Sequence, residues 1–348
     1  MKMSSSLKFN DSILPPDSLV LVTGCNGLVG SHVTNEFLAA GFRVRGTVRD
    51  VEKYAWMIDF FTQIYGPDRL TLVAVPDLTS QIAFKEAIKG VHAVAHTASS
   101  VDFLNINIPD SVRAQEICLE AAASEPTVKS FVLTGSAWAV ALPATDVERS
   151  FDTWQFNEDV VEAVKDPQQA ASNPTLTYTA CKVECEKASW AWVKKHHPSF
   201  HFNVVLLDTV FGRVLNPEKQ GIPSTTGFVQ SVVTAGEQAE WVVANVTPQW
   251  FVDTKDSGRL HVAAVASGIN NQRLFGFAER WNWDQVLDIS RKYYPSQTKS
   301  GSFGLGHDKT EVPNAPAEEL LKSVYGGAGW TTLEESIKNN VASFIPVN

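Results

Sequence analysis

Short runs of apolar, largely β-branched residues alternate with longer segments of helical period in residues 19–134. The apolar runs cover residues 19–22, 44–48, 70–75, 91–95 and 131–134. After the first run, Val33, Phe37 and Leu38 recur at helical spacing before Gly41, and glycine commonly ends helices. Strands that are apolar throughout and alternate with helices are typical of a parallel sheet buried on both faces. The pattern therefore predicts an α/β fold with a doubly wound parallel sheet.

The second half of the chain continues this pattern and then departs from it. We expect a long helix over residues 177–195, ended by Pro198, and a sixth strand over residues 202–207. After residue 212 the alternation weakens and aromatic residues become frequent, with helices expected over residues 254–266, 281–292, 315–324 and 332–343. We therefore predict a large sheet domain of residues 1–212. Residues 213–348 are expected to form mainly a smaller covering region, with some elements packing back on the sheet.

Composition narrows the class of protein. The chain has 348 residues, of which 44% are hydrophobic and 19% charged, enough apolar material for a sizeable core. Its formal net charge of −9 argues against a general polyanion binder, so no nucleic-acid partner is expected. The four cysteines, Cys25, Cys118, Cys181 and Cys185, lack the paired spacing of a zinc site and are read as reduced thiols. No secretory or membrane-spanning segment stands out, so a cytoplasmic protein is expected.

A glycine-rich segment follows the first predicted strand and opens a helix. Its residues are Thr23, Gly24, Cys25, Asn26, Gly27, Leu28, Val29 and Gly30. Glycines at this spacing allow a tight turn and a close approach of a pyrophosphate to the backbone, while the helix N-terminus supplies N–H donors. The segment predicts a dinucleotide site of the Rossmann fold, although a role in turn formation and packing alone is the simpler alternative.

The end of the second predicted strand bears on which dinucleotide binds. An NAD site usually carries an acidic residue there for the ribose 2′-hydroxyl, and this chain has Arg49 instead. A guanidinium favours a 2′-phosphate, and Lys53, one helical turn further on, offers a second positive charge. Asp50 is the counter-argument. The expected cofactor is NADPH/NADP+.

A second group of residues can carry proton chemistry. Tyr178 and Lys182 are four residues apart and therefore share one face of the predicted long helix. A nearby cation favours the phenolate form of a tyrosine, which makes Tyr178 a usable general acid or base. Ser136 stands at the carboxyl end of the fifth predicted strand, where it can donate a hydrogen bond to a substrate oxygen. The simpler alternatives are a chance surface pair and a turn-forming serine.

Taken in order, the glycine segment, the strand-five serine and the Tyr-x-x-x-Lys pair resemble the extended short-chain dehydrogenase/reductases. Residues 46–49, 77–78, 96–99, 131–134 and 329–336 are similar to the dihydroflavonol-reductase-like branch, and within it to yeast and fungal NADPH-dependent aldehyde and carbonyl reductases. The resemblance covers nearly the whole chain.

The resemblance implies roles for individual residues. Lys182 would hold the nicotinamide ribose and lower the pKa of Tyr178, Tyr178 would protonate the substrate carbonyl, and Ser136 would orient it. Gly24, Gly27 and Gly30 would lie under the pyrophosphate, Arg49 on the 2′-phosphate, Asp77 and Leu78 at the adenine, and Thr97 and Ala98 along the nicotinamide. The remaining implied cofactor contacts are Thr23, Asn26, Leu28, Val29, Lys53, Ser99, Thr134, Leu207 and Thr209.

The expected substrate pocket is aromatic with one amide. Its candidates are Trp138, Phe211, Phe228, Gln249 and Trp250. Such a lining suits aryl ketones, aromatic aldehydes or keto esters. The chain departs from the family at Leu207 and Asp208, where relatives usually carry a proline, at residues 112–115, and at the bulky Trp138, so the substrate range is where differences are expected.

Three functions stay open on this reading. The leading hypothesis is an NADPH-dependent reductase that converts aldehydes or ketones to alcohols, acting as a monomer or homodimer without a metal. The alternatives are an NAD-retaining sugar-nucleotide epimerase or dehydratase and a non-catalytic NADP-sensing regulator. Cys25 is read as a packing residue, and Cys181 and Cys185 as buried small residues.

Overall fold

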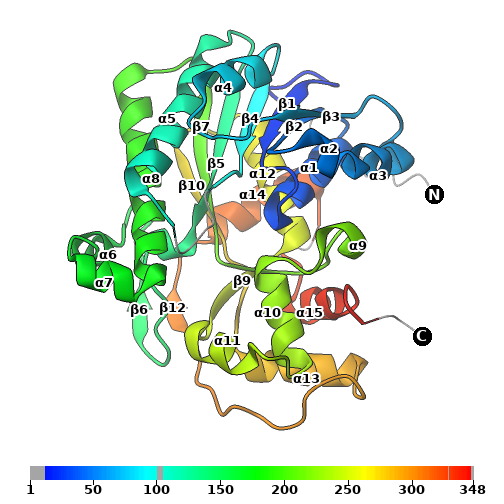
Figure 1. Cartoon of the computed structure of the whole chain (residues 1–348), viewed down its shortest axis with the longest axis vertical. Coiled ribbons are helices and arrows are strands. Elements are labelled where there is room, and N and C mark those ends of the chain that lie inside the picture. Colours follow the sequence, from blue (N-terminus) through cyan, green and yellow to red (C-terminus); the bar gives the residue numbers. More distant parts are fainter. Residues whose placement is uncertain (1–11, 100–104, 328, 346–348) are drawn as a thin grey trace.

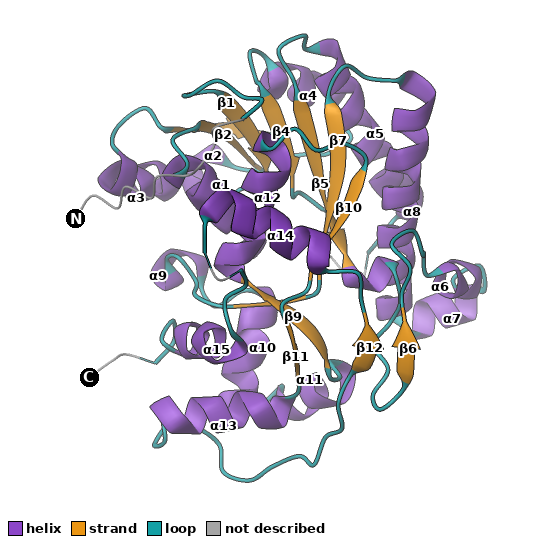
Figure 2. Cartoon of the chain, turned by 180° about the vertical axis from the view of Figure 1, so that it is seen from behind, coloured by secondary structure: helices purple, strands orange, loops and turns teal. Residues whose placement is uncertain are grey.

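A seven-stranded parallel sheet with helices on both faces forms the body of the molecule (Figures 1 and 2). The structure is a computed structural model that describes residues 12–99, 105–327 and 329–345. The strand order is β10-β7-β5-β4-β1-β2-β3. The bounds are β1 (Leu19–Thr23), β2 (Arg43–Val48), β3 (Leu70–Ala74), β4 (Ala93–His96), β5 (Ser130–Ser136), β7 (His201–Leu207) and β10 (Gln272–Gly276). The order reverses between β1 and β4, which confirms the predicted doubly wound sheet.

Apolar residues on both faces of the strands explain the two helical layers. Val20 and Val22 face a core shared with α1 (Leu28–Ala39), α12 (Thr254–Ala266) and α14 (Ala315–Tyr325). Leu21, between them, faces the opposite core, under α4 (Gln81–Ile88), α5 (Ile108–Ser124) and α8 (Pro174–His196). Successive side chains of a strand point to opposite faces, so a strand buried on both sides is apolar throughout. Shorter helices α2 (Val51–Tyr54) and α3 (Trp56–Tyr65) follow β2.

The last third of the chain contributes to both parts of the molecule. Its β10 is a strand of the main sheet, and its α12 and α14 pack against that sheet. The rest forms a smaller part of the molecule around the three-stranded sheet β11-β9-β8. Those strands are β8 (Thr209–Phe211), β9 (Gln249–Asp253) and β11 (Glu279–Trp281). They share a core with α10 (Ser224–Val233), α11 (Ala239–Asn245), α13 (Trp283–Tyr293) and α15 (Leu333–Val341), and the short α9 (Pro217–Gln220) precedes α10. The four helices predicted after residue 212 are present, but β8 to β11 were not predicted.

A third, two-stranded sheet closes one side of the junction between the two parts. β6 (Glu148–Ser150) pairs in parallel with β12 (Lys309–Glu311), which lies far from it in the sequence. The chain between β5 and α8 also carries a short 3₁₀ helix, η1 (Ala137–Ala139), α6 (Glu158–Ala163) and α7 (Pro167–Ser172). In the described part of the chain, no helix combines the length and apolarity needed to cross a membrane.

Local sequence fixes the start and end of α8, the helix that carries Tyr178 and Lys182. The side chain of Asn173 accepts a hydrogen bond from the N–H of Thr175, and Pro174 occupies the first turn, where a missing N–H costs nothing. The helix ends at His197, which adopts a left-handed conformation with φ 46° before Pro198. It therefore starts three residues earlier than the predicted 177–195, because its cap lies in the Asn173-Pro174 pair.

Candidate active site

The site residues gather where the parallel strands end. Thr23 ends β1, Arg49 follows β2, Thr97 follows β4 and Ser136 ends β5. Parallel strands present their carboxyl ends at one edge, so these residues share the edge where α/β sheets bind ligands.

Close packing explains why the glycine segment needs its glycines. Gly24 has φ +62°, and a Cβ on Gly30 would collide with the carbonyl oxygen of Gly24 and lie 2.9 Å from Oγ1 of Thr97. Gly27 differs, because it is exposed and a Cβ there would meet only the Gly24 oxygen at an ordinary 3.5 Å. Gly30 is therefore required by the fold itself, whereas Gly27 leaves open space above the loop.

Thr23 ties the glycine segment to the neighbouring strand end. Its Oγ1 accepts hydrogen bonds from the backbone N–H groups of Thr97 and Ala98, both at 3.0 Å, and lies 2.9 Å from Nδ1 of His96. Burial lowers the pKa of His96 to about 4, so its ring is neutral at pH 7 and its Nδ1 can accept the threonine proton. Thr97 donates its own hydroxyl back to the carbonyl oxygen of Thr23. Four hydrogen bonds thus join the end of β1 to the end of β4 and the residues that follow it.

Two cationic side chains stand at the end of β2. Arg49 and Lys53 are both exposed. The carboxylate of Asp50, the counter-argument for an NADP site, accepts a hydrogen bond from the N–H of Lys53 at 3.1 Å and caps α2. Its position is thus explained by helix capping.

Asp77 and Leu78, the residues expected to contact the adenine, lie on the loop after β3. Asp77 accepts hydrogen bonds from the backbone N–H and the hydroxyl of Thr79, which lower its pKa. Leu78 is half-buried against the core under α4 and α5.

Contacts link the proposed catalytic residues across three elements. Nζ of Lys182 donates to Oγ of Ser99 at 3.0 Å and lies 5.7 Å from the ring centroid of Tyr178. The Tyr178 ring meets the Trp138 indole edge-on, with centroids 6.1 Å apart. The N–H of Trp138 donates to Oγ of Ser136 at 3.3 Å. The structure therefore brings β5, η1 and α8 together around these side chains.

Other predicted cofactor contacts have structural partners. Oγ1 of Thr134 lies 2.7 Å from Nε2 of His261 and so joins β5 to α12. Leu207 pairs with Ser136 in the sheet, and Thr209 is buried just beyond it. Leu28 lies in the core under α1, while Asn26 and Val29 are half-buried.

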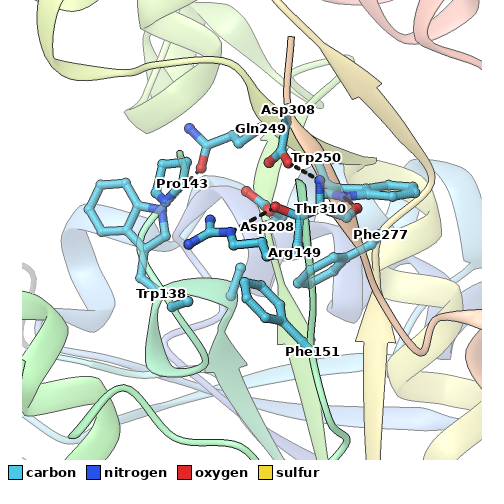
Figure 3. A pocket seen from close by; sticks show the side chains of 12 residues that line it. Trp138, Pro143, Arg149, Phe151, Asp208, Gln249, Trp250, Phe277, Asp308 and Thr310 are labelled. Atoms are coloured by element: carbon cyan, nitrogen blue, oxygen red, sulfur yellow. Dashed lines mark hydrogen bonds between the residues drawn. The ribbon is translucent and has the colours of Figure 1, made fainter. Parts of the chain in front are cut away.

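Three of the five pocket candidates line one cavity. Nε1 of Trp138 donates to Oε1 of Gln249 at 3.0 Å, and Trp250 lies beside them (Figure 3). The complete lining is Ala137, Trp138, Ala141, Pro143, Arg149, Phe151, Asp208, Gln249, Trp250, Phe277, Asp308 and Thr310. The cavity measures about 10 Å³.

Phe211 and Phe228, the other two pocket candidates, lie outside this cavity. Phe211 has no exposed surface and packs against Phe251 and Trp281 in the core of the smaller part, because this residue of β8 faces away from the main sheet. Phe228 packs on the same core beside Trp241. Neither side chain lines the cavity.

Sequence reasoning missed the contribution of the two-stranded sheet. Arg149 and Phe151 come from β6 and its end, and Asp308 and Thr310 from β12 and its start. Three-residue strands that pair across such a long stretch of sequence leave no local signal. Asp208 was noted only as a departure after β7, although an acidic residue directly after an apolar strand already pointed to the ligand edge.

The cysteines are placed as packing residues. All four are free and buried. Burial raises the pKa of the Cys25 thiol to about 12, which leaves it unreactive at pH 7. Sγ of Cys181 and Sγ of Cys185 lie 3.9 Å apart on α8. Among the described residues, no group of three or more His, Cys, Asp or Glu side chains is arranged to hold a metal ion.

Comparison with known proteins gives consistent results. Residues 20–274 match the model of the NAD dependent epimerase/dehydratase family. Aldehyde reductase 2 of Sporidiobolus salmonicolor is 37% identical over 343 residues, covering 97% of this chain and 98% of that protein. Ketoreductase adrE of Penicillium rubens is 34% identical over 350 residues, covering 95% and 97%. The yeast methylglyoxal/isovaleraldehyde reductase Gre2, solved with NADPH, shares the fold with a TM-score of 0.75 at 21% identity, covering 93% of this chain and 97% of that chain.

Proposed function

This chain belongs to the NAD dependent epimerase/dehydratase family, and we propose that it is an NADPH-dependent reductase that converts aldehydes or ketones into alcohols. The observation that carries the proposal is the contact series from Ser136 through Trp138 and Tyr178 to Lys182 at the ligand edge of the sheet. The relatives named as an aldehyde reductase and a ketoreductase support the same chemistry.

The cofactor assignment rests on the fit of the glycine segment and the two cations. Exposed Gly27 leaves room for a pyrophosphate over the loop, and the start of α1 supplies N–H donors to it. Arg49 and Lys53 would bind the 2′-phosphate that distinguishes NADPH from NADH. The solved Gre2 complex with NADPH supports this choice.

In this proposal the cofactor supplies the hydride, and three side chains of the protein handle the proton and the carbonyl oxygen. When bound, the reduced nicotinamide supplies the hydride that reaches the carbonyl carbon. Tyr178 donates its hydroxyl proton to the carbonyl oxygen, which keeps the electron pair of the broken C=O π bond and becomes the alcohol. Ser136 donates a hydrogen bond that orients this oxygen. The ammonium of Lys182 favours the phenolate that Tyr178 becomes, and would hold the nicotinamide ribose.

The substrate is proposed to be a small uncharged carbonyl compound with an aryl or ester group. Trp138, Gln249 and Trp250 would contact it through aromatic surface and one amide. Residues 1–212 would thus hold most of the cofactor, and residues 213–348 most of the substrate cover. We expect the enzyme to work in the cytoplasm as a monomer or homodimer.

A turnover assay with a Tyr178→Phe variant tests the proposal. We expect wild-type protein to oxidise NADPH faster than NADH in the presence of aryl ketones, keto esters or aromatic aldehydes. Loss of the proton donor should reduce turnover by about 10²- to 10⁴-fold, with NADPH binding retained. Wild-type turnover in a folded variant that binds NADPH would exclude this mechanism. Tightly bound NAD that copurifies with the protein would favour an epimerase or dehydratase instead.

A further inference from the structure

A half-buried carboxyl group, that of Asp208, lies beside the proposed reaction centre and has no role in the mechanism above. Asp208 directly follows Leu207, which pairs with Ser136 in the central sheet. Its side chain enters the cavity lined by Trp138 and Gln249 (Figure 3). Asp208 therefore comes one residue after the strand residue that pairs with Ser136, the proposed hydrogen-bond donor to the substrate oxygen.

Backbone donors orient this carboxyl group. Oδ1 of Asp208 accepts hydrogen bonds from the N–H of Thr209 at 2.7 Å and from its hydroxyl at 3.3 Å. The N–H of Trp250 also favours its charged form. These contacts are outweighed by burial, which together with the nearby Asp308 raises the pKa of Asp208 to about 8.

The charges around the cavity balance without an ionised Asp208. Asp308, almost fully buried, accepts a hydrogen bond from the N–H of Thr310 at 2.7 Å. Arg149 donates to Oγ1 of Thr310 and to the carbonyl oxygen of Leu142, and so brings one positive charge to the same cavity. Arg280 and Glu311 pair with each other further out, at 2.6 Å. Arg149 and Asp308 thus offset each other, and a second carboxylate would add an unbalanced buried charge.

We propose that Asp208 determines substrate specificity: its uncharged carboxyl group donates a hydrogen bond to a second oxygen of the substrate and so selects keto esters over simple ketones and keto acids. This inference rests on the proposed reductase function. The cavity of about 10 Å³ has room for a group the size of one water molecule, which fits an ester oxygen and excludes an aryl ring. A substrate carboxylate is disfavoured there, because Arg149 is already offset by Asp308 and a further anion would be an unbalanced charge in the cavity.

The test compares ethyl benzoylformate, benzoylformate and acetophenone across pH with the wild-type enzyme. Dividing kcat/KM for the keto ester by that for acetophenone cancels any pH dependence of the proton transfer and cofactor steps that both substrates share. We expect the ratio to be constant below about pH 7 and to fall up to tenfold per pH unit above about pH 8, mostly through KM. Benzoylformate should be reduced least at every pH.

Two variants sharpen the result. Asp208→Asn keeps the shape and donates at every pH, so its ratio should not change with pH. Glu311→Gln, in the outer ion pair, should keep the wild-type pH dependence. If the wild-type enzyme reduces both carbonyl compounds and the ratio does not change with pH, the role of Asp208 is overturned while the reductase function stands. The same holds if the ratio still falls at high pH in Asp208→Asn. Absence of turnover with every carbonyl overturns the reductase function as well. The wild-type measurement decides even where Asp208→Asn fails to fold.

Discussion

Arg273 and Glu186 form a bidentate ion pair inside the molecule, with Nε–Oε1 and Nη2–Oε2 distances of 2.7 and 3.1 Å. Neither side chain is more than 1% exposed. The pair joins β10, which comes from the last third of the chain, to α8, which carries Tyr178 and Lys182. Nη1 of Arg273 also donates to the carbonyl oxygens of Thr153 and Gln155. One guanidinium thus links α8, the edge strand β10 and the loop after β6.

Removing one partner of this pair should destabilise the protein strongly. Glu186→Gln leaves a buried guanidinium without its counter-ion, and we expect a loss of about 3–5 kcal/mol in the free energy of unfolding. Urea unfolding followed by tryptophan fluorescence measures it. Glu162→Gln breaks an exposed pair with Lys165 and should change stability by less than about 0.5 kcal/mol. Equal effects of the two substitutions would contradict this interpretation.

Two glycines of the cofactor loop should respond differently to alanine. Gly30→Ala forces a Cβ into the Gly24 carbonyl group, so we expect a loss of about 1–3 kcal/mol in stability together with weaker NADPH binding. Gly27→Ala meets only ordinary contacts in the protein and should weaken NADPH binding with stability unchanged. Thermal unfolding and NADPH titration separate the two cases. Unchanged NADPH binding in Gly27→Ala would place the pyrophosphate elsewhere.

Arg49 should set the preference between the two nicotinamide cofactors. Losing a charge-assisted hydrogen bond to the 2′-phosphate costs about 1.5–3 kcal/mol, so Arg49→Ala should raise the KM for NADPH about 10- to 100-fold. The KM for NADH, which lacks that phosphate, should change little. Arg43→Ala is the matched control, since Arg43 is exposed at the start of β2, the strand that Arg49 follows, and pairs with Asp17 at 3.1 Å. A parallel rise for both cofactors would argue against this role.

Trp138 should act on substrate range through Gln249. Trp138→Phe removes the indole donor and leaves the buried Oε1 of Gln249 without that bond, at a cost of about 1 kcal/mol. The freed space should raise kcat/KM for bulky aryl ketones relative to small aldehydes. Trp154→Phe changes an exposed residue that packs on Trp190 and should leave this substrate ratio unchanged. A ratio that Trp138→Phe does not move would exclude the tryptophan as a wall of the pocket.

Asp208 should also make stability depend on pH. Its pKa is raised in the folded state, so the native protein binds this proton more tightly than the unfolded chain. The resulting stability is present at low pH and is lost as pH rises towards 8, by up to about 1.4 kcal/mol per pH unit. Asp253, with a pKa raised to about 7 by burial, acts in the same direction. Urea midpoints at about pH 5 and about pH 9 should therefore differ less in Asp208→Asn than in wild type. An equal loss in both proteins would contradict the raised pKa.

The fold was predictable where sequence pattern and neighbouring contacts agree. β1 is a nearly continuous apolar run because both faces of the sheet are covered, and the glycine segment marks the turn between β1 and α1. β10 was not predicted, since its Arg273 reads as a surface residue until Glu186, distant in sequence, neutralises it. The small sheet likewise depends on pairing between distant segments, as in the register of β9 with β11.

The candidate site was likewise predictable only where residues lie close together in the sequence. Tyr178 and Lys182 lie one helical turn apart, so their shared face follows from the sequence alone. Asp308 could not be found in this way, because only the pairing of β6 with β12 brings it beside Asp208. Aromatic character alone does not separate core residues from pocket residues, and Phe211, a pocket candidate by sequence, lies in the core of the smaller part.

The return of β10, α12 and α14 to the main sheet has a consequence for cooperativity. A cut after residue 212 would strip the sheet of its edge strand and expose the core beneath α12, including Val22 and Val205. The part proposed to hold the cofactor therefore has no complete core of its own. Heat or denaturant should melt both parts in a single transition, so that neither half of the site survives the loss of the other.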